Sequence, residues 1–386
     1  MAREVFEIGG QRVVPGSRAA VALPVSAMPD HTPVDLHVEV IHGKRAGPTL
    51  FVSAAVHGDE VIGVEIVRRL LRSPQLDSLR GTLLVVPIVP AYGFLAHSRY
   101  LPDRRDLNRC FPGSAAGSLG SRLAHIFLNE VVLRCDFGID LHSAAVHRTN
   151  LPQIRVTPGD ATTAGMARDF GAPVILTSPL RDGALRGEAA VRGTPVLLYE
   201  AGEGLRFDEF AVRAGVAGIL RVMRAQGMVP AKGIARARTP SLVCRSSSWL
   251  RAPTGGLLRT FRAEGDLVAE GDLLAAVADP AGAAETELLA PGPGILIGRA
   301  VLPVVNEGDA VFHLATLSPQ ADTDTVDALT AQLEADPMFD EDEIICAGAT
   351  RAPLPAPQAH ATPVPAPPAG PGPAGPKAAM PKSCRA

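Results

Sequence analysis

The sequence predicts an α/β sandwich with a mainly parallel, buried sheet, followed by a small all-β module and a disordered tail. Apolar runs alternate with amphipathic stretches from about residue 35 to residue 235, which is typical of strands joined by helices. After Ala235 the helical pattern ends, and short apolar runs alternate with Gly-rich turns. With 386 residues and 46% hydrophobic content, the chain can bury a large core and still carry further modules.

Residues 1–235 make up the first predicted domain. Its strands are expected at residues 35–43, 48–56, 81–89, 135–141, 152–158, 173–177 and 194–200. Its helices are expected where apolar residues recur at helical spacing, at residues 60–71, 121–133, 161–170, 183–193 and 207–226.

Residues 236–318 are predicted to form a small β-barrel-like module. Two segments, AEGDLVAEGDLLAAV and VVNEGDAVFHLA, share a Gly-Asp turn followed by an apolar strand, and this weak repeat resembles the hammerhead-like barrel of biotinyl and lipoyl carriers. Residues 233–376 contain no lysine, so the amine that would carry biotin or lipoate is absent there. The carrier role is therefore excluded on chemical grounds.

The remaining residues are predicted to lie outside the folded core. Residues 319–348 form an acidic segment with one short helix expected in DTVDALTAQLEA. Residues 349–386 are a Pro/Ala-rich tail whose composition cannot bury enough apolar surface to fold alone.

Charge and composition disfavour several classes of partner. The formal net charge of −3 gives no basic field of the kind that attracts nucleic acid or an anionic membrane. No run reaches about 18 apolar residues, and the amino-terminal residues lack the apolar stretch of a signal peptide. Five scattered cysteines without a C-x-x-C pair favour reduced thiols, so we expect a cytoplasmic protein. The sequence does not distinguish a monomer from a homo-oligomer.

His57 and Glu60 are the first candidate metal ligands. The segment H-G-D-E follows the apolar run FVSAAV and opens a predicted helix, so it lies at the carboxyl end of a strand, where open α/β sheets bind ligands. An imidazole and a carboxylate three residues apart can converge on one cation. The alternative is a turn and a helix cap, since Asp59 is a good N-cap residue.

His142 and Glu200 follow two further predicted strands. In D-L-H-S, Asp140 has the right chemistry to orient the imidazole of His142, as metal-bound histidines usually require. Glu200 ends the run VLLY, where a carboxylate is costly to bury unless it has a partner or a nearby cation. A carboxylate near a metal can act as the general base and acid of amide hydrolysis. Glu203 competes for this role from further into the turn.

A charged segment between two predicted elements can recognise a carboxylate. It contains Arg99 and the run D-R-R-D-L-N-R-C-F-P-G at residues 103–113. The guanidinium of Arg109 and the amide of Asn108 suit a substrate carboxylate. For Arg104 and Arg105 we favour an internal salt bridge with Asp106.

In their order and spacing, H-G-D-E, D-L-N-R-C-F-P-G, D-L-H-S and Y-E-A-G resemble the succinylglutamate desuccinylase and aspartoacylase family, relatives of the zinc carboxypeptidases. The resemblance spans about residues 35 to 225 and implies a zinc-carboxypeptidase-like three-layer sandwich with a mixed, mainly parallel sheet. It also implies that residues 1–235 are a zinc-dependent deacylase domain that cleaves amide bonds other than peptide bonds, and the appended β module is typical of the family.

The resemblance implies a role for each motif residue. His57, Glu60 and His142 would hold one Zn2+ per chain and leave a position for water, with Glu200 as general base. Asn108 and Arg109 would bind the substrate carboxylate, and Arg99 would polarise the scissile carbonyl. The spacing from S-R-Y to D-L-N-R is two residues longer than in the aspartoacylases proper. For a second carboxylate-binding arginine, Arg186 and Arg192 are both candidates.

The sequence therefore favours an amidohydrolase that removes the acyl group from a small N-acylated amino acid or a related carboxylate. A carboxypeptidase-like metallopeptidase is the alternative among enzymes, because the same residues would serve a peptide's terminal carboxylate. A scaffold or binding protein that has lost the reaction is the alternative outside enzymes.

Overall fold

The computed structural model describes residues 3–237, 239–317 and Ala328. The acidic segment 319–348, apart from Ala328, and the Pro/Ala-rich tail 349–386 lie outside these residues, so the expectations for them are not addressed. None of the described helices is long and apolar enough to cross a membrane.

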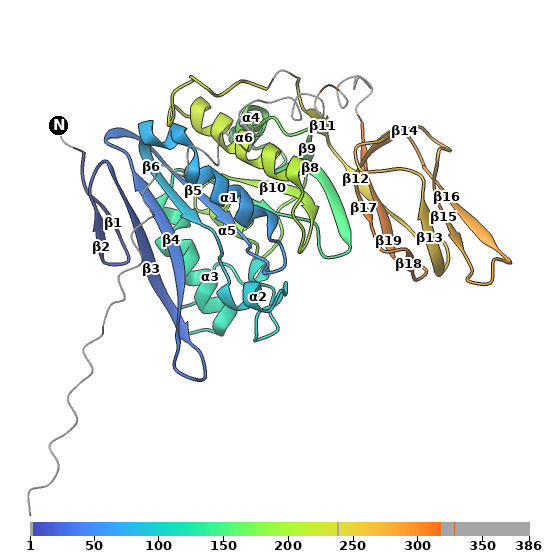
Figure 1. Cartoon of the computed structure of the whole chain (residues 1–386), viewed down its shortest axis with the longest axis horizontal. Coiled ribbons are helices and arrows are strands. Elements are labelled where there is room, and N and C mark those ends of the chain that lie inside the picture. Colours follow the sequence, from blue (N-terminus) through green and yellow to red (C-terminus); the bar gives the residue numbers. More distant parts are fainter. Residues whose placement is uncertain (1–2, 238, 318–327, 329–386) are drawn as a thin grey trace, which may run out of the picture. The chain divides into compact units, whose positions relative to one another are not determined.

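The described helices and strands alternate as the sequence predicts for residues 35–226 (Figure 1). The α-helices are α1 (Ile62–Arg72), α2 (Ala91–Leu95), α3 (Leu119–Glu130), α4 (Ala161–Phe170), α5 (Leu185–Val191) and α6 (Glu209–Ala225). Short 3₁₀ helices cover Pro74–Ser78, Leu107–Arg109 and Val132–Arg134. The strands up to α6 are β1 (Phe6–Ile8), β2 (Gln11–Val13), β3 (Ser17–Ala27), β4 (Pro33–His42), β5 (Arg45–Ala54), β6 (Arg80–Val86), β7 (Phe137–His142), β8 (Arg148–Val156), β9 (Val174–Thr177) and β10 (Val196–Glu203). The later strands are β11 (Leu242–Cys244), β12 (Ser247–Arg251), β13 (Gly256–Thr260), β14 (Leu267–Val268), β15 (Leu273–Ala278), β16 (Glu285–Leu289), β17 (Gly294–Ala300), β18 (Val304–Val305) and β19 (Ala310–Thr316).

One large mixed sheet organises the molecule. Its strand order is β12-β19-β17-β8-β10-β7-β5-β6-β4-β3. The four central strands β10, β7, β5 and β6 are parallel to one another, and the strands next to them, β8 and β4, are antiparallel. The predicted α/β class with a mixed sheet is therefore confirmed, with parallel pairing in the centre of the sheet.

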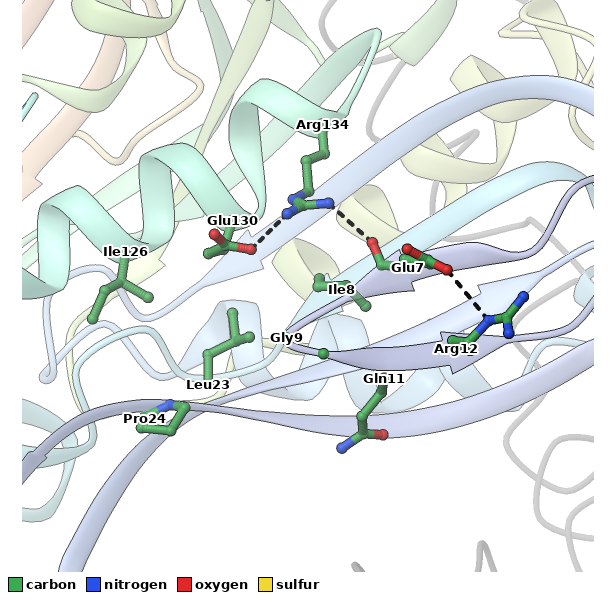
Figure 2. A pocket seen from close by; sticks show the side chains of 11 residues that line it. Glu7, Ile8, Gly9, Gln11, Arg12, Leu23, Pro24, Ile126, Glu130 and Arg134 are labelled. Carbon is green, nitrogen blue, oxygen red and sulfur yellow. Dashed lines mark hydrogen bonds and ion pairs between the residues drawn. The ribbon is translucent and has the colours of Figure 1, made fainter.

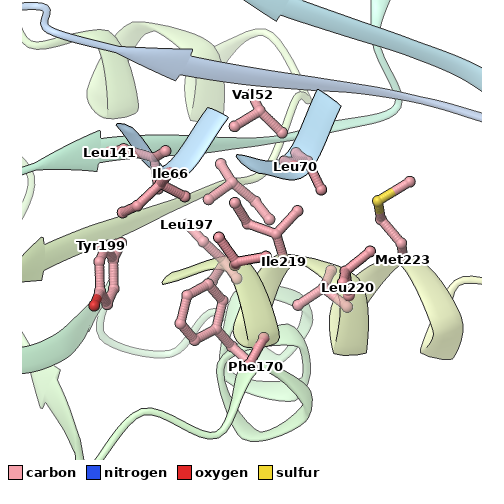
Figure 3. Close-up of a cluster of buried hydrophobic side chains, with 14 of the residues drawn as sticks. Val52, Ile66, Leu70, Leu141, Phe170, Leu197, Tyr199, Ile219, Leu220 and Met223 are labelled. Atoms are coloured by element: carbon pink, nitrogen blue, oxygen red, sulfur yellow. The ribbon is translucent and has the colours of Figure 1, made fainter. Parts of the chain in front are cut away.

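Two helical layers cover the two faces of the central strands. Successive residues of one strand serve opposite cores, as the two-residue repeat of a strand requires: Val52 packs with α1, α4 and α6, whereas Phe51 packs with α3 and α5. Figure 3 shows the first of these cores, where Ile66 of α1 and Phe170 of α4 lie on either side of Leu197 of β10 in the view, with Tyr199 of the same strand beside them. This arrangement is the predicted three-layer sandwich.

The C-terminal strands form a module that continues the large sheet. Between α6 and residue 317, the described residues form strands and loops and contain no helix, as the sequence predicts. Residues 148–150 of β8 pair with β17, residues 153–156 of the same edge pair with β9, and β9 also pairs with β11. Because two strand pairings, β8 with β17 and β9 with β11, join residues on either side of residue 235, the division of the chain into domains there stays a prediction.

The second sheet of the C-terminal module, in the order β16-β15-β13-β18, packs on the first around an apolar cluster. Leu274, Val277 and Phe312 lie in this cluster and are fully buried. The predicted small β module is therefore present, and its cluster is separate from the two cores of the three-layer sandwich.

Gly218 of α6 lets two helices approach, and its replacement separates helix propensity from packing. A Cβ on Gly218 would lie 2.1 Å from the ring of Phe170, whereas a Cβ on Gly165 of α4 would meet nothing within 4 Å. We expect Gly218→Ala to lower the free energy of unfolding by about 1–3 kcal/mol because of overpacking. Gly165→Ala should raise it by up to about 1 kcal/mol through helix propensity. Urea unfolding of both variants measures the contrast, and equal effects would contradict this account of the α4 and α6 contact.

Candidate active site

The predicted site residues lie at the carboxyl ends of three neighbouring strands. His57 follows β5, His142 ends β7, and Glu200 lies in β10 opposite His142 in the register. Because β5, β7 and β10 are parallel neighbours, their ends meet at one edge of the sheet. The fold thereby brings together these residues, which are far apart in the sequence.

A close backbone contact places the loop of Arg99 beside His57. The Gly58 amide donates to the Ser98 carbonyl oxygen at 3.1 Å. A Cβ on Gly58 would lie 1.9 Å from the carbonyl carbon of Gly93, so only glycine allows this approach. Between β5 and His57, Ala55 has a φ of 50°, a backbone conformation that non-glycine residues rarely adopt.

His57, Glu60 and His142 form a buried group in which one ligand atom from each lies within 4.8 Å of the others. The Nδ1 atoms of the two imidazoles lie 2.7 Å from the two oxygens of Glu60, one on each. All three side chains are at least 96% buried. Two neutral nitrogen ligands and one carboxylate around a common point make up a donor set suited to a divalent cation.

Two further carboxylates hold the opposite nitrogens of the imidazoles. The Nε2 atom of His57 contacts Asp106 at 3.0 Å, and the Nε2 atom of His142 contacts Asp140 at 2.8 Å. The Ser53 hydroxyl donates to the other oxygen of Asp140 at 2.7 Å. A carboxylate that accepts from Nε2–H fixes the tautomer and leaves Nδ1 as the ligand atom, which is the usual support of a metal-bound histidine.

The protonation of this group also fits a cation site. Burial lowers the pKa of His57, but Glu60 and Asp106 outweigh it, so the pKa lies above its ordinary value. The same balance of burial against Asp140 and Glu60 raises the pKa of His142 well above its usual range. Burial alone would raise the pKa of Glu60, but the two imidazoles hold it below its usual range. Because the raised pKa values of the two imidazoles strengthen proton binding where a cation could bind, we expect metal binding to release protons.

Arg99 and Asp106 are joined in a way that the sequence analysis did not predict. The Arg99 guanidinium donates to Asp106 at 2.9 Å and lies 3.4 Å from an oxygen of Glu60. Asp106 therefore bridges Arg99 and His57. The predicted salt bridge of Asp106 with Arg104 and Arg105 is absent from the described contacts, because Arg105 pairs with Asp103 instead, at 3.8 Å.

Asn108 and Arg109 lie on the next turn and face the same cavity. The Asn108 side-chain oxygen accepts a hydrogen bond from the Leu185 amide at 2.9 Å, at the start of α5. This bond leaves the amide nitrogen of Asn108 as the group that can donate to a ligand. The Arg109 guanidinium donates back to the Asn108 carbonyl oxygen. Asn108 is 8% exposed, so its orientation is fixed by burial as well.

Glu200 is held by two residues of β8. Arg155 forms an ion pair with one carboxylate oxygen at 3.3 Å, and the Asn150 amide nitrogen donates to the other at 3.1 Å. The competing residue Glu203 accepts from the His147 amide and pairs with Arg206, and it is absent from the lining of the cavity. Of the two carboxylates, Glu200 is the one that lines the cavity shared with His57, Glu60 and His142.

A cavity of about 640 Å³ contains all seven predicted site residues. Its size is that of a small-molecule site. Its described lining is strongly cationic, with two carboxylates, Glu60 and Glu200, against seven arginines: Arg99, Arg109, Arg148, Arg155, Arg181, Arg186 and Arg245. Arg186 thus lies in the site, whereas Arg192, the other candidate, pairs with Glu188 outside the lining.

The C-terminal module supplies one wall of this cavity. Trp249 of β12 and His313 of β19 stack with ring centroids 4.3 Å apart, and the Arg148 guanidinium lies 5.1 Å from the Trp249 centroid. Burial and the neighbouring Arg155 lower the pKa of His313 to about 3, so its imidazole is neutral at physiological pH. Its Nδ1 atom is buried without a partner.

A second cavity, of about 600 Å³, lies between the β1 and β2 hairpin and α3 (Figure 2). Its charged groups are paired among themselves: Arg12 with Glu7 at 3.3 Å, and Arg134 with Glu130 at 2.8 Å. It contains none of the predicted site residues. The cavity lined by His57, Glu60 and His142 is therefore the candidate active site.

Removal of an orienting carboxylate tests the proposed geometry of the metal group. We expect Asp140→Asn to weaken metal binding by about 10- to 100-fold, because the amide fixes the His142 tautomer less well. Titration of metal-free protein with Zn2+ in the presence of a competing chelator measures the affinity. Asp169→Asn, an exposed substitution on α4, is the control. An affinity that is the same in all three proteins would show that Asp140 does not support a metal ligand.

Residues 46–226 match the family model described as the succinylglutamate desuccinylase/aspartoacylase catalytic domain. A curated relative, the N-alpha-acetyl-L-2,4-diaminobutyric acid deacetylase of Halomonas elongata, is 33% identical over 98 residues. That match spans 25% of this chain and 29% of the length of the relative.

Solved structures match over most of their length. A succinylglutamate desuccinylase/aspartoacylase from Rhodobacter sphaeroides is 26% identical, with a TM-score of 0.68 over 78% of this chain and 96% of its own. The ectoine utilization protein EutE (DoeB) from Ruegeria pomeroyi, solved with product bound, is 24% identical, with a TM-score of 0.70 over 78% of this chain and 97% of its own, and shares the fold. In its sequence motifs, its family model and its fold, the part of the chain at residues 46–226 is thus similar to the succinylglutamate desuccinylase/aspartoacylase catalytic domain.

Proposed function

We propose that this protein is a zinc-dependent amidohydrolase that removes the acyl group from a small N-acylated amino acid. The observation that carries the proposal is the convergence of three groups in one cavity: the buried ligands His57, Glu60 and His142, the carboxylate Glu200, and the pair Asn108 and Arg109. The match of residues 46–226 to the succinylglutamate desuccinylase/aspartoacylase catalytic domain, and the similarity to a curated deacetylase, support the same reaction class.

The metal site is proposed from the donor set. His57, Glu60 and His142 would hold one Zn2+, with Asp106 and Asp140 accepting from the outer imidazole nitrogens. A bound zinc ion supplies Lewis acidity to the carbonyl and lowers the pKa of water. Two imidazoles and a carboxylate accept several divalent ions, and Zn2+ is the ion that such a set binds most often in hydrolases.

Glu200 is the proposed general base and acid. A carboxylate at this position can take a proton from the attacking water and deliver it to the leaving nitrogen, which must be protonated before the amide bond breaks. Its ion pair with Arg155 and its hydrogen bond from Asn150 direct the carboxylate.

Arg99 is the proposed electrophilic partner of the scissile carbonyl. Its guanidinium lies against Glu60 and His57 and is held in place by Asp106. A donor aimed at the developing oxyanion is typically worth about 3 kcal/mol of the barrier. Asn108 and Arg109 are proposed to bind the carboxylate of the amino acid, which a guanidinium recognises in a fork.

The remaining arginines favour a substrate with a second acidic group. Arg99 is paired with Asp106 and Arg155 with Glu200, which leaves Arg109, Arg181 and Arg186 of the inner lining without a described carboxylate partner. Burial is the main cause that lowers the pKa of Arg186 to about 10, and the nearby Arg155 and Arg181 act in the same direction against the opposing effect of Glu200. The Nη1 atom of Arg186 is buried without a partner. A single α-carboxylate cannot neutralise the positive charges of these three arginines.

One assay separates the candidate functions. Zinc-loaded full-length protein is incubated with N-acetyl and N-succinyl derivatives of aspartate, glutamate, leucine and 2,4-diaminobutyrate, and with dipeptides, and released amino acid is quantified. Acidic N-acyl amino acids are expected to have the highest kcat/KM, and the cationic diaminobutyrate derivative the lowest. Cleavage of dipeptides alone would establish a carboxypeptidase, and no cleavage by metallated protein would favour a binding protein.

Substitution of the two competing glutamates tests the general base. We expect Glu200→Gln to lower kcat by about 100- to 10,000-fold, because the proton can no longer be transferred to a carboxylate. The zinc content should remain that of the wild type, since Glu200 is not among the ligands. Glu203→Gln keeps an oxygen that accepts from the His147 amide and should retain wild-type kcat. A Glu203→Gln variant as inactive as Glu200→Gln would reverse the assignment.

The two candidate arginines give a matched test of substrate charge. Arg186→Met should lower kcat/KM for the best acidic substrate by about 10-fold or more, because a charged hydrogen bond is lost, and should affect the leucine derivative less. Arg192→Met removes an exposed arginine outside the cavity and should leave both substrates unchanged. Steady-state kinetics on the pair measures the difference. Equal losses for acidic and neutral substrates would contradict a second anion subsite.

A further inference from the structure

We infer that Asn150 is a positioning residue for Glu200 and that strand β17 of the C-terminal module holds it in place through Gly298. The inference rests on the proposed role of Glu200 and goes beyond it, because it gives the module a part in the catalytic step. The module then does more than narrow the entrance to the cavity.

Asn150 lies between the strand of Glu200 and the strand of the module. Its strand, β8, pairs with β10 on one edge and with β17 on the other. The register of β8 and β10 shifts between Glu200 and Gly202, and Asn150 stands opposite Gly202. This irregularity brings the Asn150 side chain to the Glu200 carboxylate, to which its amide nitrogen donates at 3.1 Å.

The side-chain oxygen of Asn150 occupies the space next to Gly298 that a Cβ there would need. In the register of β8 and β17, Asn150 stands opposite Gly298. Its side-chain oxygen lies 2.5 Å from the position that a Cβ on Gly298 would take. A larger residue at position 298 must therefore displace the amide. The opposite amide orientation would set its oxygen against a carboxylate oxygen, so the donor faces Glu200.

Further contacts stabilise the pairing of β8 with β17 next to Asn150, at Thr149 and at His147. Glu264 of the module accepts from the Thr149 hydroxyl at 3.3 Å and from Arg299 at 2.7 Å. The Val301 amide donates to the His147 carbonyl oxygen at 3.0 Å. Asn150 itself is 7% exposed. The amide is thus confined by the module on one side and by the carboxylate on the other.

The chemical consequence concerns the orientation of the base. Arg155 holds one oxygen of Glu200 and Asn150 holds the other, and both residues come from β8. With both contacts made, the carboxylate is directed toward a single position. Without Asn150 it can rotate about its side-chain bonds, and fewer enzyme molecules hold it in position for proton transfer.

A double-substitution cycle tests the inference on zinc-loaded full-length protein. The variants are Asn150→Ala, Gly298→Ala and the two combined, with Gly292→Ala as the control, because a Cβ on that glycine of the module meets nothing within 4 Å. Urea unfolding is measured for each variant, followed by kcat and KM on the best substrate.

Asn150→Ala should lower kcat by about 10- to 100-fold, the effect of losing a hydrogen bond to a charged group, with KM within about twofold of wild type. Gly298→Ala should lower kcat to a similar extent. In the Asn150→Ala background it should change kcat by less than about twofold, because the group it displaces is gone. Gly292→Ala should match the wild type. Asn150→Asp keeps the shape without the donor and should be at least as impaired as Asn150→Ala.

The unfolding measurements need no substrate and so test the contact independently of the reaction. Gly298→Ala should lower the urea midpoint in the wild type and lower it less in the Asn150→Ala background. Additive effects on the midpoint would overturn the contact between Asn150 and Gly298. An Asn150→Ala variant with wild-type kcat, in protein that Glu200→Gln inactivates, would overturn the positioning role while leaving the proposed function intact.

Discussion

The carboxylate of Glu60, shared between two buried imidazoles, is the interaction around which the candidate site is built. Its two oxygens contact His57 and His142, which arrive from different strands of the parallel sheet. An ionised carboxylate that is completely buried requires opposite charge close by, so the two histidines must face inward. Asp106 and Asp140 then supply hydrogen-bond acceptors for the outer nitrogens of the two imidazoles. One buried charge thereby sets the positions of the neighbouring polar groups.

The parallel sheet brings the residues of the candidate site together at one edge. The parallel strands β5, β7 and β10 end at one edge of the sheet, so residues at their ends meet although they are far apart in the sequence. Loops that follow β6 bring Arg99, Asn108 and Arg109 to the same place, and the glycine at position 58 permits the close approach. The cationic lining surrounds the buried group of His57, Glu60 and His142, which itself carries one carboxylate. Outside this group, Glu200 is the one carboxylate of the described lining, and it lies in a positive environment.

The sequence predicted most of the sandwich because its strands and helices have distinct periodicities. Helix α4 begins and ends at the predicted residues, and the motif residues at strand ends converge because parallel strands share an edge. Pairings between distant segments could not be predicted in the same way. Nothing in the local pattern around Asn150 indicates that β8 would bind β10, β9 and β17, or that Asp106 would prefer Arg99 and His57 to its neighbours. Such contacts depend on which strands pair with one another, and the local periodicity of a single sequence does not indicate these pairings.

The shared edge of β8 also has a consequence for biosynthesis. The β17 residues that complete this edge come from the last third of the chain and leave the ribosome well after β10. During that interval residues 148–150 of β8 present an unpaired strand edge, which is a template for association with another chain. The nascent protein therefore presents this edge for aggregation after His57, Glu60 and His142 have been made and before its C-terminal module has folded.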